Sequence, residues 1–217
     1  MKTEKNEKTA KTEKIINPGK LIVISGPSGS GKSTILKELL KSTDYKYSVS
    51  VTTREPRSGE IDGVDYYFLS KEEFLKKASS GEMLEYIEYS GYYYGTPRGP
   101  AEKMKEAGYN VIFEIDVVGA LKIKEKYPET VMIFLVPPSY AEGEKRLRSR
   151  GTETEDSINK RLESSKRELG FIYKYDYLVL NEPDLPETAA FNINCIIRAE
   201  KHKLNREKAA GFLKVYY

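Results

Sequence analysis

The sequence contains very few of the side chains that build disulfides, zinc sites and nucleophilic active sites. Its 217 residues include one cysteine, Cys195, one histidine, His202, and no tryptophan. A single cysteine cannot form an internal disulfide, which is typical of a reducing compartment, so we expect a cytoplasmic location. One cysteine and one histidine also argue against a Cys/His zinc site and against a histidine-based hydrolase. We interpret Cys195 as a small packing residue of the interior.

Long apolar runs are also absent, and the net charge is small. No stretch approaches the roughly 18–20 apolar residues of a membrane-crossing helix, and the first residues lack the apolar segment of a secretory signal. The formal net charge is only +3, and residues 1–20, with six lysines and three glutamates, account for all of it. A neutral body argues against nucleic-acid binding through net charge. We therefore expect neither a membrane nor a nucleic acid as partner, and we interpret residues 1–18 as a disordered charged tail.

Short apolar runs alternate with amphipathic helical patterns from residue 20 onward. Residues 21–25 are apolar and β-branched at three positions, as in a buried strand, and 32–41 follow with apolar residues on one helical face. Further strands are expected at 111–115, 131–136 and 177–180, and further helices at 97–107, 117–126, 139–148 and 154–170. Strands that alternate with helices predict an α/β fold whose parallel sheet is covered on both faces.

Two segments break this alternation. Residues 50–96 are rich in Tyr, Gly, Ser and Thr, and we expect them to form an insert with its own small sheet and one helix at 71–80. Residues 146–161 combine many charges with almost no apolar content, which predicts an exposed and mobile segment. Both segments are therefore candidates for moving parts beside a rigid core.

A phosphate-binding loop follows the first strand. Residues 26–33, Gly-Pro-Ser-Gly-Ser-Gly-Lys-Ser, fit the pattern G-x-x-x-x-G-K-[ST]. The glycines allow backbone N–H groups to surround phosphate oxygens at the positive end of the next helix. Lys32 would reach the β- and γ-phosphates, and the Ser33 hydroxyl would bind Mg²⁺. The alternative is a glycine-rich turn with a solvated lysine; the favoured reading is a nucleoside triphosphate site.

Further motifs follow in a fixed order. They are Thr-Thr-Arg-Glu-Pro-Arg-Ser-Gly-Glu at 52–60, Asp-Gly-Val-Asp-Tyr-Tyr-Phe at 62–68, Glu85, Tyr-Tyr-Gly at 93–95, Glu-Ile-Asp at 114–116 and the charged segment 150–162. With the phosphate loop, they make the chain resemble the guanylate kinase family from about residue 19 to 199. The resemblance implies a three-layer P-loop core (19–49, 97–140 and 165–202), a mixed-sheet insert that binds GMP (50–96) and a helical lid (141–164). Residues 203–217 lie outside it and receive no role.

The resemblance also implies an activity and its residues. The reaction is the reversible transfer of the ATP γ-phosphoryl group to GMP, and to dGMP, with Mg²⁺ as cofactor and with a monomer or homodimer as the enzyme. The implied ATP site is Gly26, Pro27, Ser28, Gly29, Ser30, Gly31, Lys32, Ser33, Thr34 and Asn181. The implied GMP site is Ser50, Arg54, Arg57, Tyr66 and Tyr94 for the phosphate, and Glu85, Thr96 and Asp116 for guanine. The implied catalytic residues are Lys32, Arg54, Arg146, Arg150 and Arg161.

Elementary chemistry supports this assignment. Planar guanidinium groups suit a phosphate dianion, and a carboxylate at Glu85 accepts the N1–H and N2–H of guanine but opposes the N1 acceptor of adenine. The GMP phosphate is already anionic, so no general base is needed. Other interpretations stay open: Arg54 and Arg57 as a solvated turn, Glu85 as a surface charge, Asp116 as a helix cap, and 146–161 as a charged face.

Three other functions are also compatible with parts of the sequence. A binding module without catalysis would share the fold, but such modules typically lose the loop residues present here. A phosphotransferase with another acceptor would not need Glu85, Thr96 and Asp116 together, and a switch or motor would need coupling segments. Two positions depart from the family pattern: Val118, where Gln is common, and Ser165, where a small apolar residue is usual.

Overall fold

The larger sheet has five strands, all parallel. The computed structural model describes residues 19–89, 91–149 and 154–216. The strands are β1 (Leu21–Ser25), β2 (Tyr45–Tyr47), β7 (Asn110–Glu114), β8 (Val131–Val136) and β9 (Tyr177–Leu180). They lie in the order β2-β7-β1-β8-β9, and each neighbouring pair is parallel. The prediction of an α/β fold with a parallel sheet is therefore confirmed.

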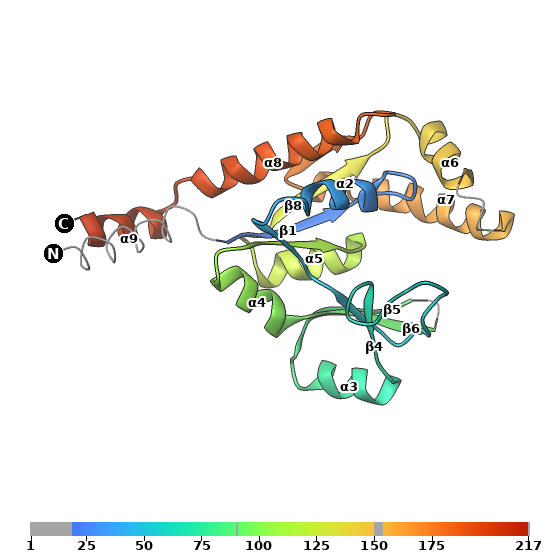
Figure 1. Ribbon diagram of the computed structural model, residues 1–217, viewed down its shortest axis with the longest axis horizontal. Coiled ribbons are helices and arrows are strands. Elements are labelled where there is room, and N and C mark those ends of the chain that lie inside the picture. Colours follow the sequence, from blue (N-terminus) through green and yellow to red (C-terminus); the bar gives the residue numbers. More distant parts are fainter. Residues whose placement is uncertain (1–18, 90, 150–153, 217) are drawn as a thin grey trace.

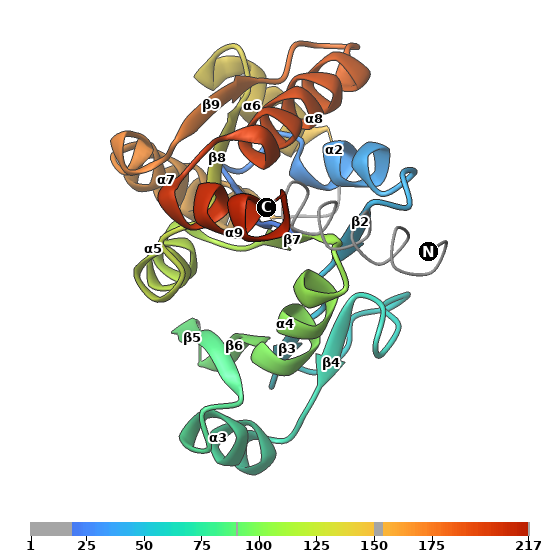
Figure 2. The same cartoon turned by 90° about the vertical axis from the view of Figure 1, so that its left-hand side faces the viewer.

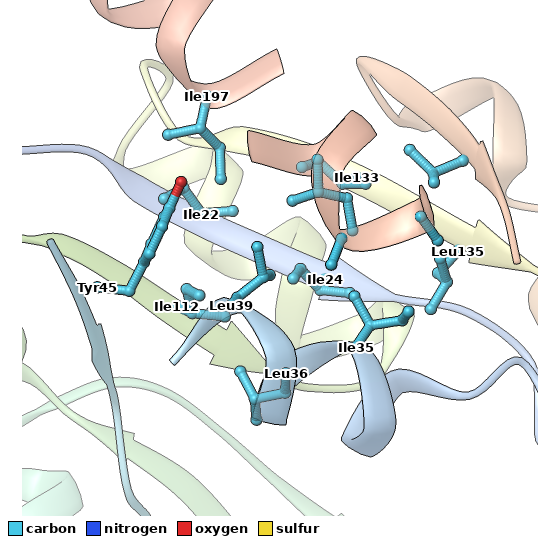
Figure 3. Packing of buried hydrophobic residues seen from close by; sticks show 14 of the residues in the cluster. Ile22, Ile24, Ile35, Leu36, Leu39, Tyr45, Ile112, Ile133, Leu135 and Ile197 are labelled. Atoms are coloured by element: carbon cyan, nitrogen blue, oxygen red, sulfur yellow. The ribbon is translucent and has the colours of Figure 1, made fainter. Parts of the chain in front are cut away.

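Helices cover both faces of this sheet. Successive side chains of β1 point to opposite faces, and because all five residues of β1 are buried, each face needs a covering layer. Ile22 and Ile24 face α2 (Lys32–Leu39) and α8 (Pro186–His202), where Figure 3 shows Leu39 and Ile197 close to them. Leu21 and Val23 face α4 (Arg98–Glu106) and α5 (Val117–Lys126). The result is a core of three layers (Figure 1).

The second sheet is small and mixed. It contains β3 (Ser50–Thr52), β4 (Tyr66–Phe68), β5 (Met83–Tyr89) and β6 (Tyr92–Pro97) in the order β4-β3-β6-β5. Strands β3 and β4 are parallel, whereas β6 is antiparallel to both its neighbours. Helix α3 (Lys71–Ser79) buries Phe74 against Val51 and Met83. In Figure 2 this unit lies below the core.

Two helices follow β8, and they correct one expectation. Helices α6 (Tyr140–Arg148) and α7 (Glu155–Leu169) bury Leu147 and Ile158 together with Leu162. Residues 146–161 were expected to form an exposed segment, which is wrong for Leu147 and Ile158, the two buried residues in its described part. Their contact joins α6 to the middle of α7, so the two helices form one packed unit.

Other elements complete the chain. A short 3₁₀ turn (Ile172–Lys174) precedes β9, and α9 (Arg206–Tyr216) continues beyond α8, away from the sheet (Figure 1). Cys195 on α8 is exposed, so its interpretation as an interior packing residue is wrong. Within the described residues, no helix combines the length and the apolar character needed to cross a bilayer.

Candidate active site

The predicted phosphate-binding loop at 26–33 joins β1 to α2 and is packed from two sides. Gly29 and Gly31 have φ angles of 80° and 87°, a region that favours glycine. A Cβ on Gly29 would lie 2.1 Å from the carbonyl oxygen of Gly143 on α6, and one on Gly31 would lie 2.2 Å from Nδ2 of Asn181. Both glycines are therefore required by conformation and by close approach.

Lys32 and Ser33 occupy the first turn of α2. The Lys32 ammonium donates to the carbonyl oxygens of Gly26 at 2.6 Å and Pro27 at 3.2 Å, so the side chain lies back across its own loop. The Ser33 hydroxyl donates to Oε1 of Glu114 at 3.2 Å, at the end of β7. Because β1 and β7 are neighbours in the sheet, their ends place this carboxylate beside the loop.

A cavity of about 500 Å³ lies between the loop and the insert. Its lining comes from the loop and α2, the ends of β2 and β7, the insert and α7: Gly26, Ser28, Lys32, Ser33, Leu36, Lys37, Leu40, Tyr47, Glu60, Val64, Asp65, Tyr66, Glu114, Ile115, Asp116 and Glu168. The structure thus brings the predicted phosphate loop, Tyr66 and Asp116 to one cavity. Five carboxylates and two lysines line it, and carboxylate oxygens are the ligands that a hard divalent cation such as Mg²⁺ prefers.

Arg54 lies at the start of the insert loop and is held by Glu60. Its Nη1 and Nη2 donate to the two carboxylate oxygens at 3.0 and 2.9 Å, and this hydrogen-bonded pair raises the pKa of Arg54 and lowers that of Glu60. Glu60 also accepts from the backbone N–H of Arg57 at 2.7 Å. The guanidinium lies over the ring of Tyr66, 5.6 Å from its centre. Tyr66 in turn contacts Tyr94 edge-to-face.

This arrangement gathers most of the predicted phosphate-binding set. Arg54, Tyr66 and Tyr94 are neighbours, and Ser50 is paired with Tyr66 in the β3–β4 ladder. Arg57 is exposed and does not line the cavity. Sequence reasoning placed Glu60 in the motif but gave it no role, although its contacts with Arg54 and Arg57 organise the loop.

Glu85 is a buried carboxylate on β5. It is 5% exposed, and Oε1 accepts a hydrogen bond from the Thr96 hydroxyl at 2.7 Å. A register shift between Met83 and Glu85 marks a bulge, a device that re-aims side chains near functional sites. Burial raises the pKa of Glu85 to about 7, against the opposing effect of the Thr96 hydrogen bond. The interpretation of Glu85 as a surface charge is wrong.

Asp116 is the N-cap of α5, as the alternative interpretation of this residue predicted. Its Oδ1 accepts from the backbone N–H of Gly119 at 2.8 Å and so caps α5. It also lines the cavity, and its negative charge contributes to the raised pKa of Glu85. Capping and a role in the site are compatible, because a carboxylate has a second oxygen that can accept further donors.

The remaining predicted residues lie on the other side of the loop. Nδ2 of Asn181 donates to the carbonyl oxygen of Ser30 at 2.8 Å, and the Asn181 carbonyl accepts from Nη2 of Arg146 at 3.1 Å. Arg161 donates through Nε to the Ser28 hydroxyl at 3.2 Å. Arg146 and Arg161 thus contact the loop region without lining the cavity. Arg150 lies outside the described residues.

Two further residues of α7 reach the loop or the cavity without a sequence signal. Glu168 lines the cavity, and its pKa is raised by burial. The Ser165 hydroxyl accepts from the backbone N–H of Ser28 at 3.0 Å and donates to the Arg161 carbonyl at 2.8 Å. Ser165 was noted only as a departure from a family pattern, and its contacts fasten α7 to the phosphate loop.

Comparison with known proteins gives a consistent result. The family model "Guanylate kinase" matches residues 18–200. A guanylate kinase of Clostridium tetani is 49% identical over 190 residues, which cover 88% of this chain and 90% of that protein. A guanylate kinase of Clostridium acetobutylicum is 50% identical with the same coverage. Among solved structures, guanylate kinase from Anaplasma phagocytophilum superposes with a TM-score of 0.70 at 38% identity, covering 86% of this chain and 88% of that one.

Proposed function

The chain belongs to the guanylate kinase family, and on that basis we propose that GMP binds on the insert side of the cavity and ATP on the side of the phosphate loop. The protein is an enzyme, a nucleoside monophosphate kinase that transfers the γ-phosphoryl group of ATP to GMP. The proposal therefore concerns which residues hold each nucleotide and how they promote transfer.

The loop at 26–34 would hold the ATP phosphates. Its backbone N–H groups and the positive end of α2 favour an anion there. The Lys32 ammonium, now bonded to carbonyl oxygens of its own loop, would exchange those partners for phosphate oxygens. Asn181 would support the loop through its hydrogen bond to the Ser30 carbonyl, and this bond would keep the loop in the conformation that binds phosphate.

The donors beside the loop fit Mg²⁺. Ser33 and Glu114 present a hydroxyl and a carboxylate oxygen 3.2 Å apart at the cavity wall, and Mg²⁺ prefers oxygen ligands. This ion commonly uses one or two protein oxygens together with substrate phosphates. When bound, it would neutralise charge on the phosphates of ATP.

The insert would bind both the phosphate and the guanine base of GMP. Arg54, Arg57, Tyr66, Tyr94 and Ser50 would bind the phosphate, with Glu60 fixing the Arg54 fork in place. Glu85 and Thr96 would read the guanine edge, with Asp116 close by. Glu85 must be ionised to accept two N–H groups, so guanine binding would favour loss of its proton.

Transfer would depend on alignment and on neutralisation of charge. The attacking oxygen of GMP is already anionic, so the chain needs to orient it towards the γ-phosphorus and to shield the charge that develops. Lys32 would provide one positive charge, and Arg146, Arg150 and Arg161 would provide others when the helical unit closes over ATP. Closure would also exclude water and so suppress ATP hydrolysis.

The buried pair of Glu85 and Thr96 carries the assignment of GMP, because a carboxylate at 5% exposure with one oxygen bonded leaves the other for a base. The test measures ADP release with GMP, dGMP, AMP, UMP or no acceptor. We expect activity with the guanine nucleotides, and Glu85→Ala should lower kcat/KM for GMP by about 10⁴-fold while the KM for ATP stays within about twofold. Equal losses for both substrates would reject Glu85 as the base reader.

A further inference from the structure

Helix α5 of the core is fastened to strand β5 of the insert on both sides of Glu85. The Lys122 ammonium donates to the carbonyl oxygen of Tyr86, and the Lys126 ammonium donates to that of Leu84. These two carbonyls belong to the residues immediately before and after Glu85. The bonds therefore fix how closely the helix approaches the strand at the position of the carboxylate.

Gly119 lies on the same face of α5, three residues before Lys122 and seven before Lys126. A Cβ built on it would lie 2.9 Å from Oε2 and 3.2 Å from Cδ of Glu85, and 3.4 Å from Oδ1 of Asp116. Ordinary contact of this kind begins near 3.4 Å, so the Glu85 oxygen would have to retreat by about half an ångström.

Glu85 has little freedom to make that retreat. Its side chain is buried, its other oxygen is held by the Thr96 hydroxyl at 2.7 Å, and its neighbours in the strand are held by the two lysines. A methyl group at position 119 would therefore displace the carboxylate or push the helix away from the strand.

The backbone gives no separate reason for glycine at this position. Gly119 lies inside α5 and is absent from the described residues with positive φ, so any residue could adopt its conformation. Glycine is less favourable than alanine within a helix. Gly99 in α4 provides the contrast, because a Cβ there would have no atom within 4 Å.

We propose that Gly119 is a positioning residue for base selection, whose missing side chain lets the Glu85 carboxylate lie at the distance that guanine requires. The inference rests on the proposed role of Glu85 as the guanine reader. It assigns selectivity to a position that cannot itself contact a base through a side chain. It also predicts a substitution that leaves the protein folded, with a stability near that of wild type, and yet makes it less selective.

The experiment compares Gly119→Ala with the matched helical control Gly99→Ala. The acceptors are GMP and IMP, which lacks the 2-amino group of guanine. Gly119→Ala should lower kcat/KM for GMP by about 10- to 100-fold, and IMP use by a smaller factor, because displacement near 1 Å is costly for a preorganised site. The KM for ATP should stay within about twofold of wild type. Gly99→Ala should leave kcat/KM unchanged for both GMP and IMP.

Melting temperature separates positioning from damage to the fold. Gly119→Ala should stay folded and melt within about 4 °C of wild type, because the gain in helix propensity offsets part of the cost of displacing the carboxylate. Gly119→Ser serves as a second variant of similar size with the same expected loss of selectivity. An unchanged ratio of GMP to IMP use in a folded Gly119→Ala protein would overturn the inference.

A double mutant distinguishes this inference from the proposed function. In a Glu85→Ala background the steric conflict is removed, so adding Gly119→Ala should have no further effect on GMP use. A further loss equal to that of the single variant would show that Gly119 acts elsewhere and would overturn the inference. If Glu85→Ala itself left GMP use intact, the role of Glu85 would be rejected and the inference would fall with it.

Discussion

Arg54 and Glu60 form a two-pronged ion pair, with Nη1–Oε2 and Nη2–Oε1 distances of 3.0 and 2.9 Å. Both side chains are largely shielded from solvent, at 11% and 19% exposure. The carboxylate holds the guanidinium beside the rings of Tyr66 and Phe68, with its central carbon 5.6 and 5.9 Å from the two ring centres. The arginine assigned to the GMP phosphate is therefore oriented before any nucleotide binds.

The first prediction concerns this orientation. Glu60→Gln keeps the size of the side chain but removes the charge that fixes Arg54 and the backbone of Arg57. We expect the KM for GMP to rise about tenfold, since a charge-assisted bidentate bond contributes on the order of 1.4 kcal/mol or more. Glu82→Gln is the matched control, because it removes an exposed ion pair with Lys77 in the same insert. A fall in the KM would instead mean that Glu60 competes with the phosphate.

The second prediction concerns Lys32. Lys32→Ala should abolish turnover and leave the fold intact, because two of its hydrogen bonds go to carbonyls of its own loop and its proposed work is done on ATP. Steady-state ADP release and the circular dichroism melting curve measure the two effects. Lys41 lies two residues after the end of α2 and its side chain is exposed, so the control variant Lys41→Ala should keep normal activity. Near-normal turnover of Lys32→Ala would contradict the mechanism.

The third prediction concerns pH and Glu85. Burial raises the pKa of this carboxyl from 4.5 to about 7, so the folded protein holds the proton more tightly than the unfolded chain does. The resulting stability is fully present below pH 4.5 and is lost as the pH rises through about 7. Glu85→Gln cannot titrate. We therefore expect wild type to lose on the order of 3 kcal/mol relative to Glu85→Gln between pH 4.5 and 7.5.

Urea denaturation at several pH values would measure that difference. Groups far from position 85 contribute equally to both proteins, so the difference reports Glu85 together with its coupling to Asp116. Parallel pH profiles for the two proteins would show that Glu85 has an ordinary pKa and would contradict the role of burial.

The fourth prediction concerns Asn181. Asn181→Ala leaves the buried Ser30 carbonyl without its donor, and we expect a loss of about 1–2 kcal/mol in the free energy of unfolding. The phosphate loop would also lose support, so the KM for ATP should rise about tenfold while the KM for GMP stays nearly constant. The control for stability alone is Asn194→Ala. Asn194 lies on α8, and its side-chain oxygen accepts a hydrogen bond from the Tyr45 hydroxyl. Equal changes in both KM values would contradict a role confined to the loop.

Much of the core could be predicted from the sequence, because buried parallel strands are continuous apolar runs. The bounds predicted at 21–25, 131–136 and 177–180 coincide with β1, β8 and β9. Strand β2 was missed, since Tyr-Lys-Tyr is short and only its first residue is buried. Its place at the sheet edge depends on pairing with β7, more than 60 residues later.

Two errors have different physical origins. Leu147 and Ile158 are isolated among charges, and they become buried only because α6 and α7 meet in space. Cys195, by contrast, was predictable: Ile193 and Ile197 form the buried stripe of α8, and a residue between them points to the opposite face. Helical periodicity should have taken precedence there over the usual burial of cysteine.

The candidate site shows the same limit of sequence reasoning. Motifs indicated Lys32 and Arg54 because each belongs to a short pattern, and the resemblance to the guanylate kinase family indicated Glu85 by its place in the order of those motifs. Glu168 has no such pattern and reaches the cavity only through the course of α7. The contact between Ser33 and Glu114 spans 81 positions and exists because β1 and β7 are sheet neighbours.

The joint between α5 and β5 has a consequence for exchanging parts between related enzymes. Lys122 and Lys126 bond to main-chain carbonyls of the strand, which every amino acid provides. An insert from another family member could therefore form the same two hydrogen bonds with this core, provided that it carries an apolar residue at the position of Leu84, which is buried in the same cluster as Ala120 and Ile123 of α5. In the reverse graft, a host helix without the two lysines would lose these hydrogen bonds, and a side chain at the position of Gly119 would crowd the glutamate. Modularity in this enzyme thus depends on the helix that receives the insert.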